Sequence, residues 1–247
     1  MTEKLSDKEL ITAKLRFDEN LRYIKSEIAL AAEKAGKKAE DIILLAATKT
    51  VPTEIINYAA EQGIRFVGEN KVQEFTSKLP DLDSRLHRHF IGHLQTNKVK
   101  YIVGNVELIH SVDSLKLANE IAKQSLKKGI VSDILLEVNI GNEASKSGFK
   151  ASEVYENYKI ISQIEGVCIK GLMCIPPEEE KTGDSDAYFA QMSKLFIDIS
   201  AQNMDNNSMQ YLSMGMSGDF ARAIGFGANI VRIGTALFGE RNYQTIK

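Results

Sequence analysis

Apolar positions near the start of the chain recur with a helical spacing. Phe17, Leu21, Ile24, Ile28 and Ala31 are separated alternately by four and three residues. This spacing puts them on one face of a long helix and predicts that this face packs against a core.

Both ends of this helix carry sequence signals. Ser6 and Glu9 have the spacing of a capping box, in which a hydroxyl and a carboxylate three residues later satisfy free amide groups reciprocally. Gly36 follows the last apolar position and predicts the end of the helix.

From Ile42 onward the pattern changes to short apolar runs, each followed by a turn and a segment of helical periodicity. Eight runs are predicted to be strands: Ile42–Thr48, Arg65–Gly68, His89–Gly92, Leu108–Ser111, Ile134–Asn139, Cys168–Met173, Tyr211–Met214 and Ile230–Gly234. The clearest helices between them are marked by Leu115, Ala118, Ala122 and Leu126, by Val154, Tyr158 and Ile161, and by Phe189, Met192, Phe196 and Ile199. The first run is apolar on both faces, as parallel strands covered by helices must be. Eight repeats favour an α/β fold, a single (β/α)₈ TIM barrel with an extra N-terminal helix. An open doubly wound sheet is the alternative.

The length of the chain agrees with one large domain. Its 247 residues are close to the roughly 250 that are typical of such a barrel, although two domains of about 120 residues would also fit. No linker rich in proline, glycine or serine divides the chain. We therefore expect residues 1–247 to form a single domain.

The charge balance and the hydropathy of the chain limit which ligands and which location are expected. Lys and Arg number 31 against 33 Asp and Glu, so a net charge of -2 gives no reason to expect nucleic acid, and a small molecule is the default ligand. No apolar run approaches the roughly 20 residues that cross a bilayer, and the first ten residues lack a secretory apolar region, so we expect a cytoplasmic protein. Cys168 and Cys174 lack the spacing of a redox or metal site and are expected to be reduced.

Lys49 is the first candidate for chemistry. It follows the first predicted strand directly, so a barrel would place it at the C-terminal mouth, pointing inward. Partial burial there would lower its pKa and prepare the amine to attack an aldehyde and form an imine. Taken alone, the segment also fits a lysine that leaves the strand for solvent.

Two segments after the seventh and eighth strands predict an anion site. Leu212–Asp219 contains Ser217 and opens a short helix, where hydroxyls and free amides bind anions. In Val231–Thr235, Gly234 allows close approach of a ligand and Thr235 supplies a hydroxyl. Barrels commonly bind phosphate at these two strand ends. A phosphate site across the mouth from a reactive lysine indicates pyridoxal 5′-phosphate (PLP).

Two further side chains fit this ligand. Arg232 could face the pyridine nitrogen and keep it unprotonated, which weakens the ring as an electron sink, or it could form a structural ion pair. Asn70, at the end of the second strand, could hydrogen-bond the ring hydroxyl or imine region, or cap a helix.

The histidines offer a rival metal site. His87, His89 and His93 could place two imidazoles on one strand face and a third near the rim. No cysteine or carboxylate pattern nearby completes a catalytic site, so we expect no metal.

Several of these segments together resemble the pyridoxal phosphate homeostasis protein family. The motifs are Ala47–Thr50, Gly68–Asn70, His89–Lys98, Ser145–Gly148 and Gly171–Met173, together with the two C-terminal segments named above. The resemblance runs from about Leu44 to Arg241, in the family's order and with similar intervals. Arg88 and Asn229 depart from the residues common in the family, and neither touches the expected pocket.

The resemblance implies a barrel like the N-terminal domain of alanine racemase. It implies that Lys49 holds PLP as a Schiff base, that Arg232 faces the pyridine nitrogen, and that Ser217, Gly234 and Thr235 surround the phosphate. It also implies a role in PLP homeostasis without established catalytic turnover.

Three hypotheses follow from the sequence. The first is a monomeric carrier that delivers PLP through transient contact with apoenzymes. Lys146, in a polar loop after the fifth strand, could accept the cofactor during exchange or be an ordinary solvated lysine. The second is a PLP-dependent amino-acid racemase or decarboxylase; related racemases take a tyrosine base from a second domain, and this chain ends soon after the eighth strand, which favours the carrier. The third is a metal-dependent hydrolase built on the histidines.

Overall fold

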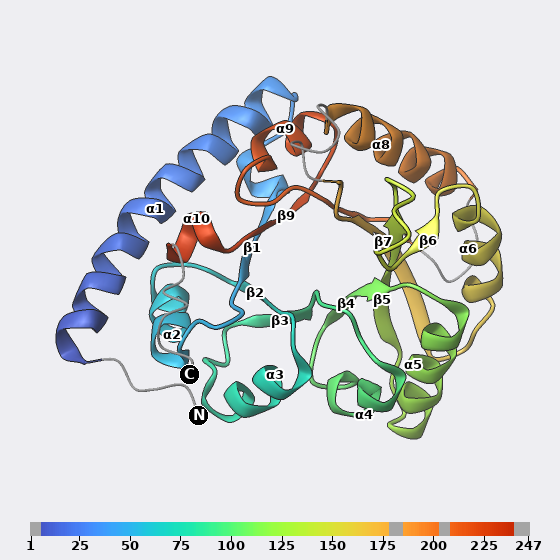
Figure 1. Cartoon of the computed structure of the whole chain (residues 1–247), viewed down its shortest axis with the longest axis horizontal. Coiled ribbons are helices and arrows are strands. Elements are labelled where there is room, and N and C mark those ends of the chain that lie inside the picture. The colour runs from blue at the N-terminus through green and yellow to red at the C-terminus, as the bar shows by residue number, and fades with distance from the viewer. Residues whose placement is uncertain (1–5, 178–184, 203–207, 240–247) are drawn as a thin grey trace.

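Eight parallel strands close into a barrel around the centre of the molecule (Figure 1). The structure is a computed structural model that describes residues 6–177, 185–202 and 208–239. The barrel strands are β1 (Ile43–Ala47), β2 (Phe66–Glu69), β3 (His87–Phe90), β4 (Leu108–Val112), β5 (Ser132–Asn139), β7 (Val167–Cys174), β8 (Tyr211–Ser213) and β9 (Ile230–Ile233). Strand β1 pairs with both β2 and β9, and β4 pairs with β5, so the sheet closes on itself. The predicted (β/α)₈ barrel is confirmed, and closure excludes the open doubly wound sheet.

All eight predicted strands are present with boundaries within two residues of the prediction, and one short strand is added. Strand β3 begins at His87 instead of His89 and ends at Phe90, because its pairing with β2 starts with His87 opposite Phe66. The short strand β6 (Phe149–Lys150), which was not predicted, adds to the C-terminal end of β5.

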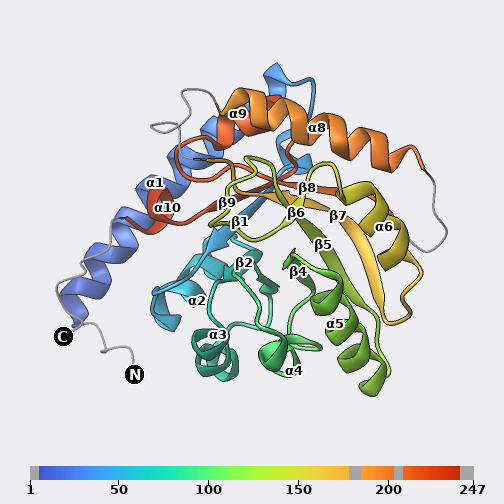
Figure 2. The same ribbon diagram turned by 45° about the vertical axis from the view of Figure 1, so that its right-hand side comes forward.

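Helices surround the barrel in both views (Figures 1 and 2). They are α1 (Asp7–Lys34), α2 (Thr53–Glu61), α3 (Val72–Lys78), α4 (Val99–Ile102), α5 (Leu115–Lys127), α6 (Val154–Ser162), α8 (Asp186–Ser200), α9 (Phe220–Gly225) and α10 (Thr235–Phe238), with 3-10 turns at Ala39–Asp41, Leu79–Asp81 and Thr96–Lys98. Among the described helices, none combines the length and apolar character needed to cross a bilayer.

The N-terminal helix α1 packs against α10, the last helix that the structure describes. Its capping box forms as predicted: the Ser6 side chain accepts from the Glu9 amide, and the Glu9 carboxylate accepts from the Ser6 amide. Phe17 stacks on Phe238 with ring centroids 5.5 Å apart, and the Asn20 amide donates to the Leu237 carbonyl at 3.1 Å. The helix therefore fixes α10, which opens at the predicted phosphate site.

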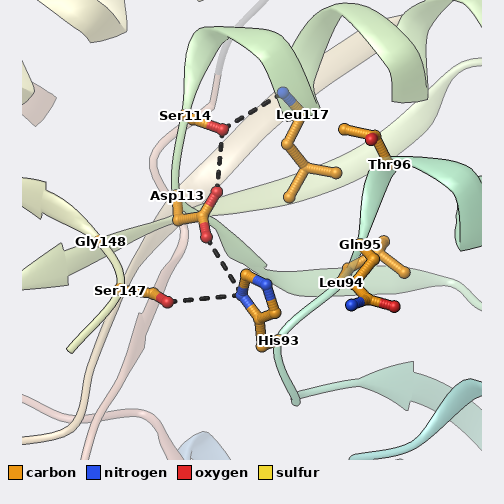
Figure 3. A pocket seen from close by; sticks show the side chains of 9 residues that line it. All are labelled: His93, Leu94, Gln95, Thr96, Asp113, Ser114, Leu117, Ser147 and Gly148. Carbon is orange, nitrogen blue, oxygen red and sulfur yellow. Dashed lines mark hydrogen bonds and ion pairs between the residues drawn. The ribbon is translucent and has the colours of Figure 1, made fainter. Parts of the chain in front are cut away.

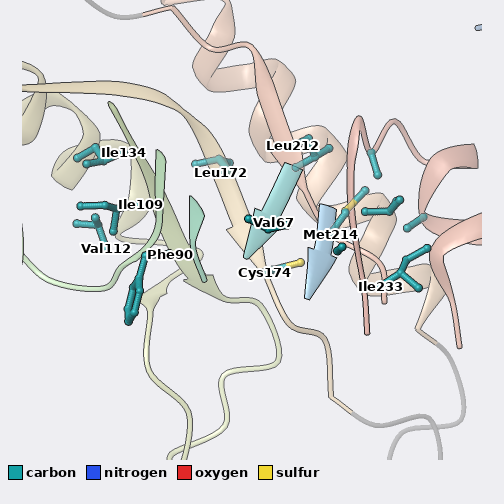
Figure 4. Close-up of a cluster of buried hydrophobic side chains, with 14 of the residues drawn as sticks. Val67, Phe90, Ile109, Val112, Ile134, Leu172, Cys174, Leu212, Met214 and Ile233 are labelled. Carbon is teal, nitrogen blue, oxygen red and sulfur yellow. The ribbon is translucent and has the colours of Figure 1, made fainter. Parts of the chain in front are cut away.

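Successive side chains of each strand point to opposite faces of the barrel wall, so the apolar residues form two layers. One cluster packs between the strands and the helices, and its labelled members include Val67, Phe90 and Ile233 (Figure 4). A smaller cluster fills the barrel interior with Leu45, Ala47, Ile91, Leu108, Leu135, Met173 and Ile230. Polar side chains share the inward positions with this second cluster, and they build the site described next.

Candidate functional site

Lys49 lies at the C-terminal mouth of the barrel, as predicted. It is partly buried and follows Leu45 and Ala47, which belong to the interior cluster, at alternate positions along β1. The chain turns sharply after it, because Thr50 has a φ of 64°. A lysine in this place can present its amine to a ligand at the mouth.

Asn70 lies directly after β2, next to the Lys49 strand. Its side-chain oxygen is buried and, within the described part of the chain, has no hydrogen-bond partner. Gly92, after β3, packs tightly on the Asn70 backbone, since a Cβ there would lie 2.1 Å from the Asn70 carbonyl oxygen. The orphaned oxygen indicates that a ligand or solvent completes the site.

The predicted phosphate residues meet where β8 and β9 end. The Ser217 hydroxyl accepts from the Ala236 amide at 3.2 Å, which links the β8 loop to the first turn of α10. Gly234 is the N-cap of α10, and Thr235 is exposed as its first residue. A Cβ on Gly234 would lie 3.2 Å from the Ala47 carbonyl oxygen, so this turn also borders the Lys49 strand.

Arg232 is buried inside the barrel with 5% of its surface exposed. Its Nη1 donates to the carbonyl and the hydroxyl of Ser213 at 2.8 and 2.7 Å, and its Nη2 donates to the Cys174 carbonyl at 2.8 Å. These acceptors are neutral oxygens, which argues against the structural ion pair. They engage three of the five donors of the guanidinium and leave two that a ligand could meet.

A buried chain of hydrogen bonds continues from Ser213 through two histidines. Nδ1 of His110 lies 3.0 Å from the Ser213 hydroxyl, and Nε2 of His110 lies 2.9 Å from Nδ1 of His89. A guanidinium can only donate, so a single direction from Arg232 to His89 satisfies every member with neutral imidazoles. Burial lowers the pKa of His89 to about 3, and burial, with His89 and Arg232 nearby, lowers the pKa of His110 well below its ordinary value. The chain therefore holds Arg232 without adding charge.

One carboxyl shares the interior with Arg232. Burial, together with the nearby Asp113, raises the pKa of Glu137 to about 7, while Arg232 and His93 oppose the rise. The Cys174 thiol is also buried, and burial raises its pKa to about 12. That thiol stays protonated at neutral pH.

A pocket of 460 Å³ opens beside the mouth, over the ends of β3 and β4 (Figure 3). His93 projects into it, with Nδ1 3.3 Å from an Asp113 oxygen and 3.4 Å from the Ser147 hydroxyl. The neighbouring Lys146 pairs with Glu143 at 2.6 Å and donates to the Pro176 carbonyl at 3.1 Å. Two sequence motifs, His89–Lys98 and Ser145–Gly148, thus converge on this side of the rim.

The three histidines proposed as metal ligands do not converge. The ring of His87 pairs with Glu107 at 2.7 Å, whereas the rings of His89 and His93 pair with His110 and Asp113. Across the described ranges, no three His, Cys, Asp or Glu side chains group as metal ligands would. The geometry gives no support to a hydrolase built on these residues.

Sequence reasoning missed several residues of the site. His110, Glu137 and Ser213 lie within β4, β5 and β8, and the sequence pattern predicted none of them as a site residue. The available signal was alternation along the strand, because each lies two residues after a side chain of the interior cluster or packed against it, Leu108, Leu135 or Tyr211.

Comparisons with known proteins identify the family. Residues 20–242 match the family of the alanine racemase N-terminal domain. The pyridoxal phosphate homeostasis protein of Aquifex aeolicus is 46% identical over 228 residues, which cover 91% of this chain and 98% of that protein. The chain belongs to the pyridoxal phosphate homeostasis protein family. The resemblance inferred from the motifs is therefore confirmed.

Solved structures of this family have the same fold. A crystal structure described as an unknown protein from Bifidobacterium adolescentis is 33% identical and superposes with a TM-score of 0.88, over 95% of this chain and 98% of that one. PipY of Synechococcus elongatus PCC7942, in a structure with PLP bound, is 31% identical, with a TM-score of 0.77 over 90% of this chain and 100% of PipY.

Proposed function

We propose that the chain binds PLP as a Schiff base on Lys49 and takes part in PLP homeostasis. The remaining binding residues are Asn70 beside the ring, Arg232 facing the pyridine nitrogen, and Ser217, Gly234 and Thr235 around the phosphate. When bound, the cofactor supplies an electrophilic aldehyde for the amine and a dianionic phosphate for the cradle.

One observation carries the proposal: a lysine and a hydroxyl-rich helix start lie on neighbouring strands of the same mouth. Strand β1, which leads to Lys49, pairs with β9, which leads to Gly234 and Thr235. Arg232, two residues before Gly234, is buried, and two of its five guanidinium donors are not used by Ser213 or Cys174. An amine, a cation and a cradle at the ends of two paired strands suit a planar ligand with an aldehyde and a phosphate.

The names of the relatives support the proposed role in PLP homeostasis. The curated relatives are named homeostasis proteins, and the PipY structure has PLP bound. We infer that this chain, acting as one domain, holds PLP without catalytic turnover and releases it to apoenzymes through transient contact. A monomer in the cytoplasm would suit that role.

The test is borohydride reduction of the PLP-loaded protein followed by peptide mapping. We expect the reduced adduct on Lys49, and we expect Lys49→Ala to remain colourless when PLP is added. Lys146→Ala is the matched control and should form the adduct normally. An adduct of unchanged yield in Lys49→Ala would refute the proposal.

The control variant also tests Lys146 as an acceptor during exchange. Its ammonium lies at the rim and is held by Glu143 and the Pro176 carbonyl. We expect Lys146→Ala to slow the transfer of PLP to an apoenzyme while adduct formation stays unchanged. Equal transfer rates in the variant and the wild type would remove Lys146 from the pathway.

A further inference from the structure

Both neighbours of Lys49 in the chain are held by a buried ion network. The Lys78 ammonium donates to the carbonyl oxygen of Thr48, the residue before Lys49, at 2.9 Å. The amide of Thr50, the residue after Lys49, donates to the Glu74 carboxylate. Side chains from helix α3 thus hold the backbone on each side of the proposed cofactor lysine.

The network is compact and centred on Lys78. Its ammonium lies 2.7 Å from oxygens of both Glu69 and Glu74, so these contacts and the Thr48 carbonyl use all three of its donors. The exposed fractions of the Lys78, Glu69 and Glu74 side chains are 5%, 4% and 17%. The Thr48 hydroxyl also donates to Glu69, at 2.7 Å. Thr48 is therefore fixed through its main chain and its side chain.

The backbone after Lys49 needs such support. Thr50 has a φ of 64°, in the left-handed region that β-branched residues rarely adopt. A residue in that region persists only where its surroundings determine its conformation. The bond from its amide to Glu74 supplies one such constraint, and the pairing of Glu74 with Lys78 fixes the acceptor.

We propose that Lys78, together with Glu69 and Glu74, is a positioning network that fixes the Lys49 backbone so that the amine reaches the bound aldehyde. This inference rests on the proposed function. Lys78 itself touches neither the cofactor nor the reacting atoms. It acts through Thr48 and Thr50, and its removal should weaken the covalent part of PLP binding while sparing the phosphate cradle on the other side of β1.

A double-mutant cycle separates positioning from general stability. PLP affinity is measured by calorimetry for four proteins: the wild type, Lys78→Met, Lys49→Ala and the double variant. In the two proteins that carry Lys49→Ala, PLP is expected to bind only non-covalently. We expect Lys78→Met to weaken binding about tenfold when Lys49 is present and less than about twofold when it is absent. Lys71→Met, an exposed lysine at the start of the same helix, is the matched control and should change neither value.

A second variant covers the case in which Lys78→Met does not fold. Lys78→Met combined with Glu69→Gln keeps the volume and removes both buried charges, and it should show the same dependence on Lys49. Equal weakening in both backgrounds, or none, would overturn the positioning role alone. An adduct that forms normally in Lys49→Ala would instead overturn the proposed function, and the positioning role with it.

Discussion

Gly92 is the position where the smallest change should disturb the site most directly. It follows β3 and packs against the backbone of Asn70 on the neighbouring strand. In Gly92→Ala the new methyl carbon would lie 2.1 Å from the Asn70 carbonyl oxygen and 2.6 Å from its Cα. These are main-chain atoms, so no side chain can swing away to make room.

The size of the effect follows from the displacement required. Ordinary contact begins near 3.4 Å, so the two segments must separate by about 1.3 Å, the difference between 3.4 and 2.1 Å. Overpacking of this kind typically costs about 1–3 kcal/mol, which for a chain of this length lowers the melting temperature by roughly 2–12 °C. Asn70 moves with the strand end, so loss of its proposed hydrogen bond to the cofactor should weaken PLP binding by roughly two- to tenfold.

Urea denaturation and PLP titration of the same samples measure both effects. Gly225→Ala is the matched control, since nothing lies within 4 Å of a Cβ at that position, near the end of α9. It should be neutral or slightly stabilising. If Gly92→Ala had the same free energy of unfolding and the same PLP affinity as Gly225→Ala, the inference that the two strand ends pack tightly would be refuted.

Two further predictions concern the core and the buried carboxyl. Phe17→Ala, at a side chain that is 1% exposed, should lower the free energy of unfolding by about 3–5 kcal/mol in urea denaturation, whereas Tyr23→Ala, 62% exposed on the same helix, should change it little. Glu137, whose pKa is raised from 4.5 to about 7, should stabilise the fold below pH 4.5 and lose roughly 3 kcal/mol of that contribution as the pH rises to 7, because the unfolded carboxyl ionises first. Glu137→Gln should flatten this slope in cofactor-free protein. If Glu137→Gln left the pH dependence of stability unchanged, or if Glu33→Gln at an exposed position changed it equally, the prediction would be contradicted.

Periodicity predicted the fold well because each barrel strand is short, apolar and followed by a helix. It placed β3 two residues too late because His87 and Arg88, which begin that strand, are polar. In the structure the His87 ring stacks on Phe66 with centroids 4.8 Å apart, a pairing between strands that no local pattern reveals. Strand β6 has two residues, too few to produce any period.

The positions of the proposed binding residues at strand ends were predictable, whereas the residues that support them were not. Lys49, Gly234 and Thr235 lie where a barrel places its ligands, so the strand pattern was enough to select them. Lys78 is the last residue of a short helix, where a lysine usually meets solvent, and only the tertiary structure shows that it is buried. Likewise, His110 becomes part of the site through Ser213, which is 103 residues away in the sequence.

Two separate buried networks hold the two ends of the proposed site, and their chemistry differs for a physical reason. On the β2 side of β1, the network that holds the Lys49 backbone consists of ions, and its groups are paired with one another. On the β9 side, the hydrogen-bond chain that holds Arg232 consists of neutral groups, and among the described residues no carboxylate accepts a hydrogen bond from its guanidinium. A guanidinium held this way keeps its charge available to a ligand, whereas an ion pair would have cancelled it. The proposed cofactor lysine needs a fixed backbone, the arginine needs a charge that its hydrogen-bond partners do not neutralise, and each network provides the one that its residue requires.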